Sequence, residues 1–141
     1  MGPENLWVTG MLITMALSEL LIQQAELEEK AIEQVVAKHV RYSDAGTIIL
    51  LESFSKLPAK KQLATYLDAK AGWKYIPGKE ALADGADNAE LERMLRLPGG
   101  TIRPKTSELR SEGLIVTRDG KHFPTEQLVF ALTADGEVPK A

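Results

Sequence analysis

The chain has 141 residues, a formal net charge of −3 and no cysteine. This length permits one domain, or a small domain with an added dimerisation element, and the absence of cysteine excludes a disulfide framework and a thiolate metal site. A content of 44% hydrophobic and 26% charged residues is ordinary for a soluble globular protein, and we expect a cytoplasmic one.

The first third of the chain favours helix from about Leu12 to Val40. Residues 6–22 are almost entirely apolar, which is also typical of a membrane segment. Glu19 interrupts this run and polar side chains follow it directly, so the run is shorter than the roughly 20 apolar residues of a spanning helix. No basic residue precedes it, as one does in a signal peptide. We therefore expect no membrane insertion.

A second helix is predicted from Ala45 to Lys56, with Ser43 and Asp44 as its cap. Residues 1–57 then form a helical extension. A long helix with an apolar stripe outside a small domain usually buries that stripe against a second copy of the chain. We expect a homodimer through these amino-terminal helices, although an intramolecular helical layer over the core would satisfy the same stripe.

The middle of the chain predicts one helix and one short strand. Pro58 opens a helix that runs to about Ala71, and Gly72 ends it. The aromatic run 73–76 (WKYI) is suited to a strand. Residues 77–87 then form a long connector that contains turn residues.

Residues 88–124 carry the most informative pattern in the chain. A helix is predicted from Asn88, its amino cap, and Pro98-Gly99-Gly100 stops it. Thr101 is a good amino cap for the next helix, whose first turn would contain Pro104. Two helices joined by a short turn that contains glycine form a helix-turn-helix.

A β-hairpin is predicted directly after the second helix. Residues 114–117 are apolar and β-branched enough for a strand, and the Asp-Gly pair at 119–120 is the strongest short hairpin signal. Residues 122–125 would make the return strand. Residues 125–134 fit either a strand or a short helix, and we expect the tail 135–141 to be disordered.

This order of helix, turn, helix and hairpin resembles the winged helix-turn-helix family of DNA-binding domains. The resemblance implies an α+β, mostly helical fold, with the winged domain at residues 58–134 and a helical extension before it. It also implies that the strand at 73–76 pairs with the wing. Helix 101–112 would enter the major groove of duplex DNA and wing 114–125 would contact the backbone, as in a transcription regulator.

The predicted recognition helix has one side that faces the domain, with Ile102, Thr106, Leu109 and Gly113 on it. Its other side carries Arg and Ser, which can bond base edges and phosphates, and the wing tip carries two further cations. The candidate DNA-binding residues that the resemblance assigns are Thr101, Arg103, Lys105, Ser107, Arg110, Ser111, Arg118 and Lys121.

The charge is distributed unevenly along the chain. Residues 93–122 hold seven basic and three acidic side chains, a net charge of +4, whereas residues 1–57 hold four basic and eight acidic ones, a net charge of −4. Phosphate attraction depends on the local patch, because salt screens charges beyond about 10 Å. The pattern predicts a basic face on an acidic body, with moderate DNA affinity and a modest dependence on salt.

Catalytic chemistry is not indicated anywhere in the chain. His39 and His122 stand in no metal-ligand spacing, and no nucleophile motif surrounds the serines. We therefore expect neither an enzyme nor a cofactor or metal site.

Two alternatives to DNA binding remain open. A winged-helix fold could serve as a protein-interaction module that docks onto a polymerase, replication or phage-encoded partner. Burial of Arg103 and Arg110 against acidic residues would favour that function. A regulator that responds to a small apolar molecule, bound in the core under Trp73 and Tyr75, is the other alternative.

Overall fold

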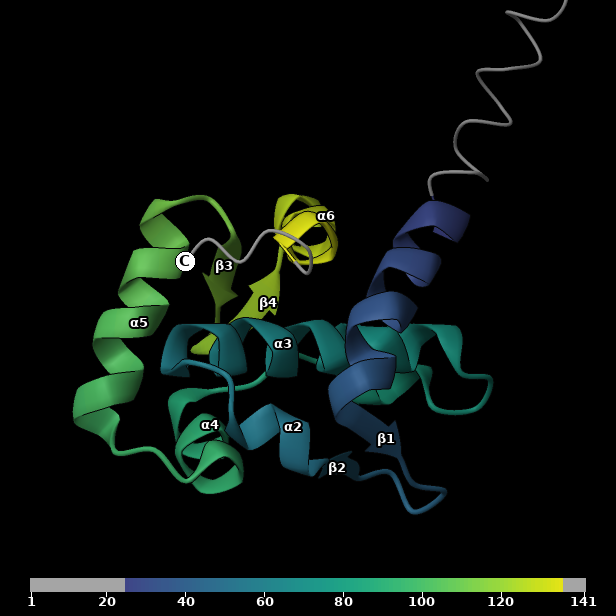
Figure 1. Ribbon diagram of the computed structural model, residues 1–141, viewed down its shortest axis with the longest axis horizontal. Coiled ribbons are helices and arrows are strands. Elements are labelled where there is room, and N and C mark those ends of the chain that lie inside the picture. The colour runs from purple at the N-terminus through teal and green to yellow at the C-terminus, as the bar shows by residue number, and fades with distance from the viewer. Residues whose placement is uncertain (1–24, 136–141) are drawn as a thin grey trace, which may run out of the picture.

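Helix α3 (Ala59–Gly72) is the element around which the other elements are arranged in the computed structural model (Figure 1). The structure describes residues 25–135, so the expected helix before residue 25 and the expected disordered tail after residue 135 lie outside the described part. All residues from Leu63 to Ala69 are buried. A helix that is buried on every side belongs in the centre of a fold.

A helix, a hairpin and a short helix precede α3 in the chain. These elements are the helix 25–39, β1 (Val40–Tyr42), β2 (Ile48–Leu50) and α2 (Glu52–Ser55). Strands β1 and β2 pair in antiparallel fashion, with Val40 opposite Leu50.

The predicted helix Ala45–Lys56 is therefore wrong over its first half, and only its end, α2, is helical. Ser43, expected to cap that helix, instead lies in the turn of the β1–β2 hairpin, where its backbone N–H donates to the Thr47 carbonyl at 2.9 Å. Gly46 has a φ of +90°, which closes the turn and which a residue with a Cβ rarely adopts. Because Ile48 and its neighbour Ile49 are β-branched, they favour the strand that follows.

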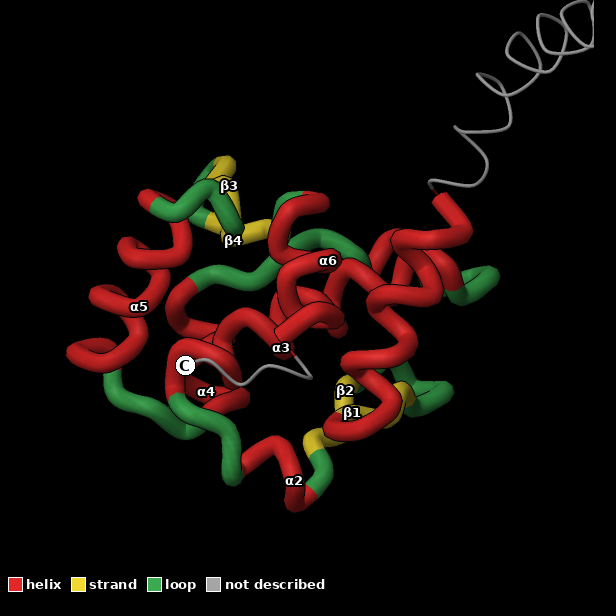
Figure 2. The backbone as a smooth tube through the Cα atoms, turned by 45° about the horizontal axis from the view of Figure 1, so that its top comes forward, coloured by secondary structure: helices red, strands yellow, loops and turns green. Residues whose placement is uncertain are grey.

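Seven elements run from the end of α3 to the end of the described chain. These elements are η1 (Trp73–Tyr75), η2 (Glu80–Leu82), α4 (Asn88–Leu95), α5 (Gly99–Ser111), β3 (Ile115–Arg118), β4 (Lys121–Pro124) and α6 (Glu126–Asp135). The β1–β2 and β3–β4 hairpins form separate two-stranded sheets that lie on different sides of α3 (Figure 2). The fold is thus α+β and mostly helical, and of the two alternatives for 125–134 the structure contains the helix.

The strand predicted at 73–76 is also wrong, because these residues continue α3 as a turn of 3-10 helix. Trp73 is almost fully buried, and its ring packs edge-on against that of Tyr42 at a centroid distance of 4.6 Å. A different residue pairs with the wing. Ala86 forms an isolated antiparallel bridge with His122, with N–O distances of 3.2 and 2.9 Å.

Gly85 allows that bridge to form. Its φ is +74°, and a Cβ on this residue would lie 2.7 Å from the carbonyl oxygen of His122 and 2.9 Å from the ring of Phe123. Any larger residue would therefore push the connector away from β4.

The helix 25–39 packs onto the same core as α3 and α6. Ile32 and Val36 are buried there, and the Thr133 hydroxyl of α6 donates to the carbonyl of Ala31 at 3.3 Å. The stripe is thus covered within one chain at Ile32 and Val36, as the intramolecular alternative predicts, but Leu27 is 54% exposed, and the homodimer stays a prediction. Within residues 25–135 no helix is long and apolar enough to cross a membrane.

Candidate nucleic-acid interface

Helices α4 and α5 are joined by a turn that the sequence prediction placed slightly wrongly. The side chain of Asp87, not of Asn88, caps α4 by accepting a hydrogen bond from the backbone N–H of Glu90 at 2.8 Å. The helix ends at Arg96, whose φ of +56° is left-handed. A left-handed residue at this place reverses the chain direction, and here an arginine takes a position that glycine usually occupies.

Helix α5 begins earlier than predicted. Its cap residue is Pro98, and Gly99 and Gly100 form its first turn rather than stopping α4. Thr101 is therefore an ordinary helical residue and not a cap. Pro104 lies inside the helix, beyond the first turn, where its missing N–H leaves the carbonyl of Gly100 without the usual partner four residues on.

The predicted division of α5 into two sides is confirmed within the helix, but Gly113, predicted on the buried side, lies beyond its end and is exposed. Ile102, Thr106 and Leu109 are buried against the core, and the Thr106 hydroxyl donates to the carbonyl of Arg103 at 3.0 Å, so this polar group is satisfied. The residues on the opposite side are all exposed. We call this surface the α5 face, and its members are Arg103, Ser107, Arg110 and Ser111.

A chain of hydrogen bonds ties the α5 face to the hairpin β3–β4. Arg110 Nη1 donates to Thr117 Oγ1 at 3.1 Å, and Thr117 Oγ1 lies 2.8 Å from Nδ1 of His122. Nε2 of His122 lies 2.9 Å from Asn88 Oδ1 in α4. With a neutral ring every bond is satisfied when Thr117 donates to Nδ1 and the Nε2–H of His122 donates to Asn88. The chain links α5, both strands of the hairpin and α4.

His122 is neutral in this arrangement. Only 4% of its surface is exposed. Burial and the positive charge of Arg110 lower the pKa of His122, while Asp87 opposes that shift. Since the neutral ring keeps Nδ1 as an acceptor, Thr117 can donate to it and still accept from Arg110.

Lys105 and Thr101 lie apart from the α5 face. Lys105 Nζ is 3.9 Å from Glu108 Oε2. Lys60 of α3 lies 3.3 Å from Glu108 and 2.9 Å from Glu112. Lys105 thus belongs to a group of mixed charge between α3 and α5, and Thr101 is half-buried.

The two cations at the wing tip lie on the other face of the hairpin. In the β3–β4 register Thr117 is opposite His122, and Arg118 is opposite Lys121. Because successive side chains of a strand point to opposite faces, Arg118 and Lys121 point away from the side that Thr117 shares with Arg110. The Arg118 guanidinium stacks over the ring of Phe123 at 4.3 Å, and Lys121 Nζ lies 3.2 Å from Asp84.

The structure therefore divides the eight predicted residues among three places: the α5 face, the α3–α5 side and the outer face of the wing. Sequence reasoning missed Thr117, His122 and Asn88 as parts of the site. Strand alternation from the buried Ile115 would have placed Thr117 inward. No local signal links Asn88 to His122, since they meet only in the folded chain.

In the described part of the chain, no group of three or more His, Asp or Glu side chains could hold a metal ion. Comparisons of the chain with protein-family models, with curated proteins and with solved structures give no match.

Proposed function

We propose that this protein binds duplex DNA as a winged helix-turn-helix regulator, with α5 in the major groove and the β3–β4 hairpin against the backbone. The order α3, Ala86 bridge, α4, α5 and hairpin supports this proposal, because it is the element order of that family. The observation that carries it is the α5 face: exposed arginines and serines on one helix, with Arg110 bonded to the wing.

The spacing on the α5 face suits base readout. Arg103 and Arg110 are seven residues apart, so they lie about 10 Å apart along the helix axis, on the same side. That distance matches about three steps of the DNA duplex at 3.4 Å each. A guanidinium can donate two hydrogen bonds to guanine, and the Ser107 hydroxyl between them can bond a base edge or a phosphate.

The arginines of this surface keep their charge unpaired, although the Glu92 carboxylate of α4 and the Arg103 guanidinium both lie close to Gly99. The acidic residues Glu108 and Glu112 lie on the adjoining side of α5, where Lys60 of α3 neutralises part of their charge. No ion pair with an acidic group involves Arg103 or Arg110 within residues 25–135, and both side chains are exposed. This exposure disfavours the alternative in which these arginines serve a buried protein contact.

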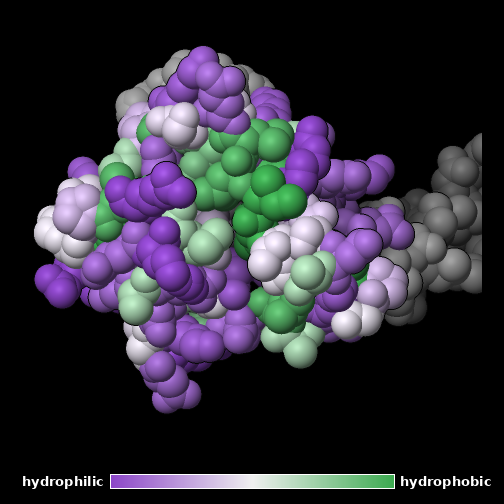
Figure 3. Space-filling view, turned by 90° about the horizontal axis from the view of Figure 1, so that it is seen from below, coloured by the Kyte–Doolittle hydropathy of each residue, from purple (hydrophilic) through white to green (hydrophobic). Residues whose placement is uncertain are grey.

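A second candidate is a protein-interaction module. The observation that favours it is a groove of about 590 Å³ between the β2–α2 segment and α4, where Leu51, Met94 and Leu97 alternate with polar residues such as Gln62 and Arg96. Figure 3 shows hydrophobic residues gathered in the middle of this face. Such a groove suits the apolar side of an amphipathic helix from a partner protein.

The test of DNA binding is a titration of the full chain against a fluorescently labelled random-sequence duplex, from low to physiological salt. We expect affinity that falls with salt. In the variant Arg103→Ala/Arg110→Ala the affinity for this duplex should fall, since binding to random sequence rests on cation–phosphate contacts. The salt slope should fall by about one for each phosphate contact that is lost.

The matched control is Lys30→Ala/Lys38→Ala. It removes the same charge from exposed positions of the helix 25–39, which lies on the other side of α3 from α5 (Figure 1). This variant should bind DNA like the unmodified chain. Equal losses of DNA affinity in the two variants would show that only the total charge of the protein matters. If the full chain does not bind DNA even at low salt, the proposal is wrong, and the groove beside α4 becomes the candidate interface.

A further inference from the structure

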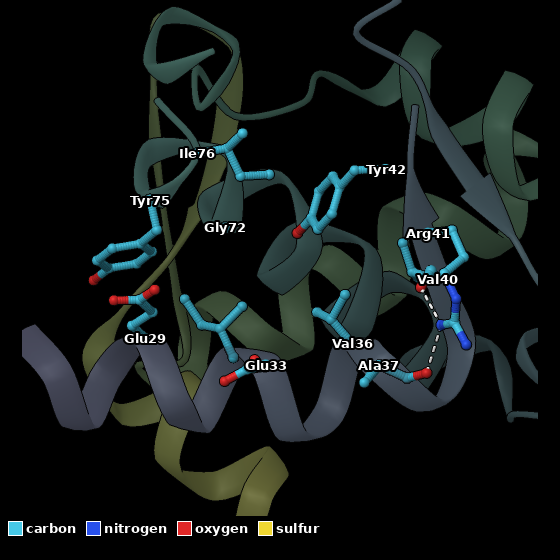
Figure 4. A pocket seen from close by; sticks show the side chains of 11 residues that line it. Glu29, Glu33, Val36, Ala37, Val40, Arg41, Tyr42, Gly72, Tyr75 and Ile76 are labelled. Carbon is cyan, nitrogen blue, oxygen red and sulfur yellow. Dashed lines mark hydrogen bonds between the residues drawn. The ribbon is translucent and has the colours of Figure 1, made fainter. Parts of the chain in front are cut away.

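A cavity of about 370 Å³ lies between the helix 25–39, strand β1 and the end of α3 (Figure 4). Its lining is mainly apolar and includes Ile32, Val36, Val40 and Ile76. Cavities that bind small molecules are typically of this size and have this kind of lining, with a few polar groups that orient the ligand. None of the α5-face residues contributes to it.

Two tyrosine rings form part of the cavity wall and are held in place by hydrogen bonds. The Tyr42 hydroxyl donates to the carbonyl of Ala69 at 2.6 Å, and the Tyr75 hydroxyl donates to Glu28 at 2.6 Å. Gly72 makes room for Tyr42, because a Cβ on Gly72 would collide with its hydroxyl. The wall is therefore formed before any ligand arrives, which lowers the entropic cost of binding.

Carboxylates surround this cavity. Glu29 and Glu33 line it, and in Figure 4 the Glu29 carboxylate points toward the ring of Tyr75. The charges of Glu28 and Glu29 both raise the pKa of Tyr75, although burial is the larger cause. Asp68 of α3 is a fully buried carboxyl group nearby; burial and the charge of Glu28 raise its pKa to about 8, so it does not add to the negative charge at neutral pH.

The two basic side chains near this cavity, Arg41 and Lys74, already bind other groups of the protein. Arg41 Nη1 donates to the carbonyls of Ala37 and Val40 at 2.6 and 2.8 Å, at the end of the helix 25–39. Lys74 Nζ lies 3.4 Å from Glu28. The carbonyl bonds of Arg41 leave its positive charge in place at the cavity. Glu29 and Glu33 line the cavity too and have no ion-pair partner within the described chain, so two carboxylates face one guanidinium and the lining keeps a net negative charge.

We propose that this cavity binds a small organic cation, a protonated amine on a compact aryl or branched alkyl body. The apolar body lies between Ile32, Val36 and Ile76, and the ammonium group lies beside Glu29 against the electron-rich face of Tyr75. Lys74 already lies 5.2 Å from the centroid of that ring, so Glu29 and Glu33 supply the main attraction for the ligand's ammonium group. The proposal does not rest on DNA binding.

The test compares three ligands of one shape by calorimetry on the full chain: 2-naphthylmethylamine, 2-naphthylmethanol and 2-naphthoate. We expect the amine to bind most tightly and the carboxylate most weakly. Replacing the positive charge of the ligand by a negative one, next to one carboxylate of the protein, changes the binding free energy by about 1 kcal/mol or more. The affinities of 2-naphthylmethylamine and 2-naphthoate should therefore differ by about tenfold. Equal affinities for the amine and the carboxylate, or no binding of the amine, would overturn the proposal.

Two variants locate the site. Ile76→Trp fills the cavity and should abolish binding of all three ligands, while Glu29→Gln should weaken only the amine, by several-fold. Glu52→Gln makes the same charge change at an exposed residue outside the cavity and should have no effect. Amine binding that survives in Ile76→Trp, or that Glu52→Gln weakens as much as Glu29→Gln, would place the ligand elsewhere and contradict the assignment.

Discussion

The two sides of helix α3 differ in the sign of their free charge and in how their polar groups are satisfied. On the α5 side the arginines reach solvent, and one of them is bonded through Thr117 to a buried neutral histidine. On the side of the helix 25–39 the cations are paired or bonded to carbonyls, and carboxylates remain around an apolar cavity. The net charge of −3 therefore does not predict the charge of either surface. The fold places the free arginines and the free carboxylates on different parts of the molecule, and salt screens the two surfaces from each other.

The variant with the largest expected effect removes a side chain from the core that both sides share. Trp73→Ala should lower the free energy of unfolding by about 3–5 kcal/mol, because it leaves a cavity beside Tyr42 and removes a buried indole. Urea denaturation monitored by circular dichroism measures the loss. Val116→Ala is the control: this side chain is 41% exposed, and its truncation should change stability by no more than about 0.5 kcal/mol. Equal effects of both variants would contradict the described packing of Trp73.

The next prediction concerns the acidic side. Burial, with the charge of Glu28 as a second cause, raises the pKa of Asp68 to about 8, and neither of its carboxyl oxygens has a hydrogen-bond partner in the described chain. The folded state therefore keeps the proton that the unfolded state loses near pH 4. The stability that this group contributes is full below pH 4 and is lost as the pH rises toward 8.

Asp68→Asn removes that titration. From pH 5 to pH 7 the unmodified chain should lose about 2–3 kcal/mol more unfolding free energy than the variant, since each pH unit corresponds to about 1.4 kcal/mol. Denaturation curves at several pH values measure the difference. Asp44→Asn changes an exposed carboxylate in the same way and should leave the pH dependence as it is. If Asp68→Asn showed the unmodified pH profile, Asp68 would be ionised in the folded protein.

The smallest of these effects concerns the basic side. Thr117→Val keeps the shape of the side chain but leaves Arg110 and the Nδ1 atom of His122 without their partner. The loss should cost about 1–2 kcal/mol of stability at neutral pH, because a buried acceptor loses its donor. DNA affinity should also fall, since Arg110 is no longer held toward the wing. Ser107→Ala leaves the hydrogen bonds among Arg110, Thr117 and His122 intact. If this variant lost as much stability as Thr117→Val, the stabilising role of these hydrogen bonds would be contradicted.

Several elements could be predicted closely because local signals determine them. The prediction for α3, from Pro58 to about Ala71, differs by one residue at each end from the observed helix. The Asp119-Gly120 turn has φ values of +52° and +78°, which is the left-handed geometry that such a pair favours. The buried side of α5 followed from helical periodicity alone.

The errors occur where tertiary contacts outweigh local pattern. The segment 45–56 has an apolar periodicity that suits a helix, but Gly46 and the β-branched residues after it make a hairpin. The aromatic run after α3 is turned into a helical continuation by the burial of Trp73. In the site, sequence spacing grouped the wing cations with Arg110, whereas the strand register places them on the opposite face of the hairpin.

The interior proline of α5 has a consequence for motion. The first turn of this helix contains Gly99 and Gly100, has no side-chain cap and lacks the hydrogen bond that Pro104 cannot make. Glycine also costs about 1 kcal/mol relative to alanine in a helix, so this turn is held weakly, while Ile102 and Leu109 anchor the rest to the core. We therefore expect the amino end of α5 to fray more readily than the part that Ile102 and Leu109 anchor, and hydrogen exchange of its backbone amides would measure this.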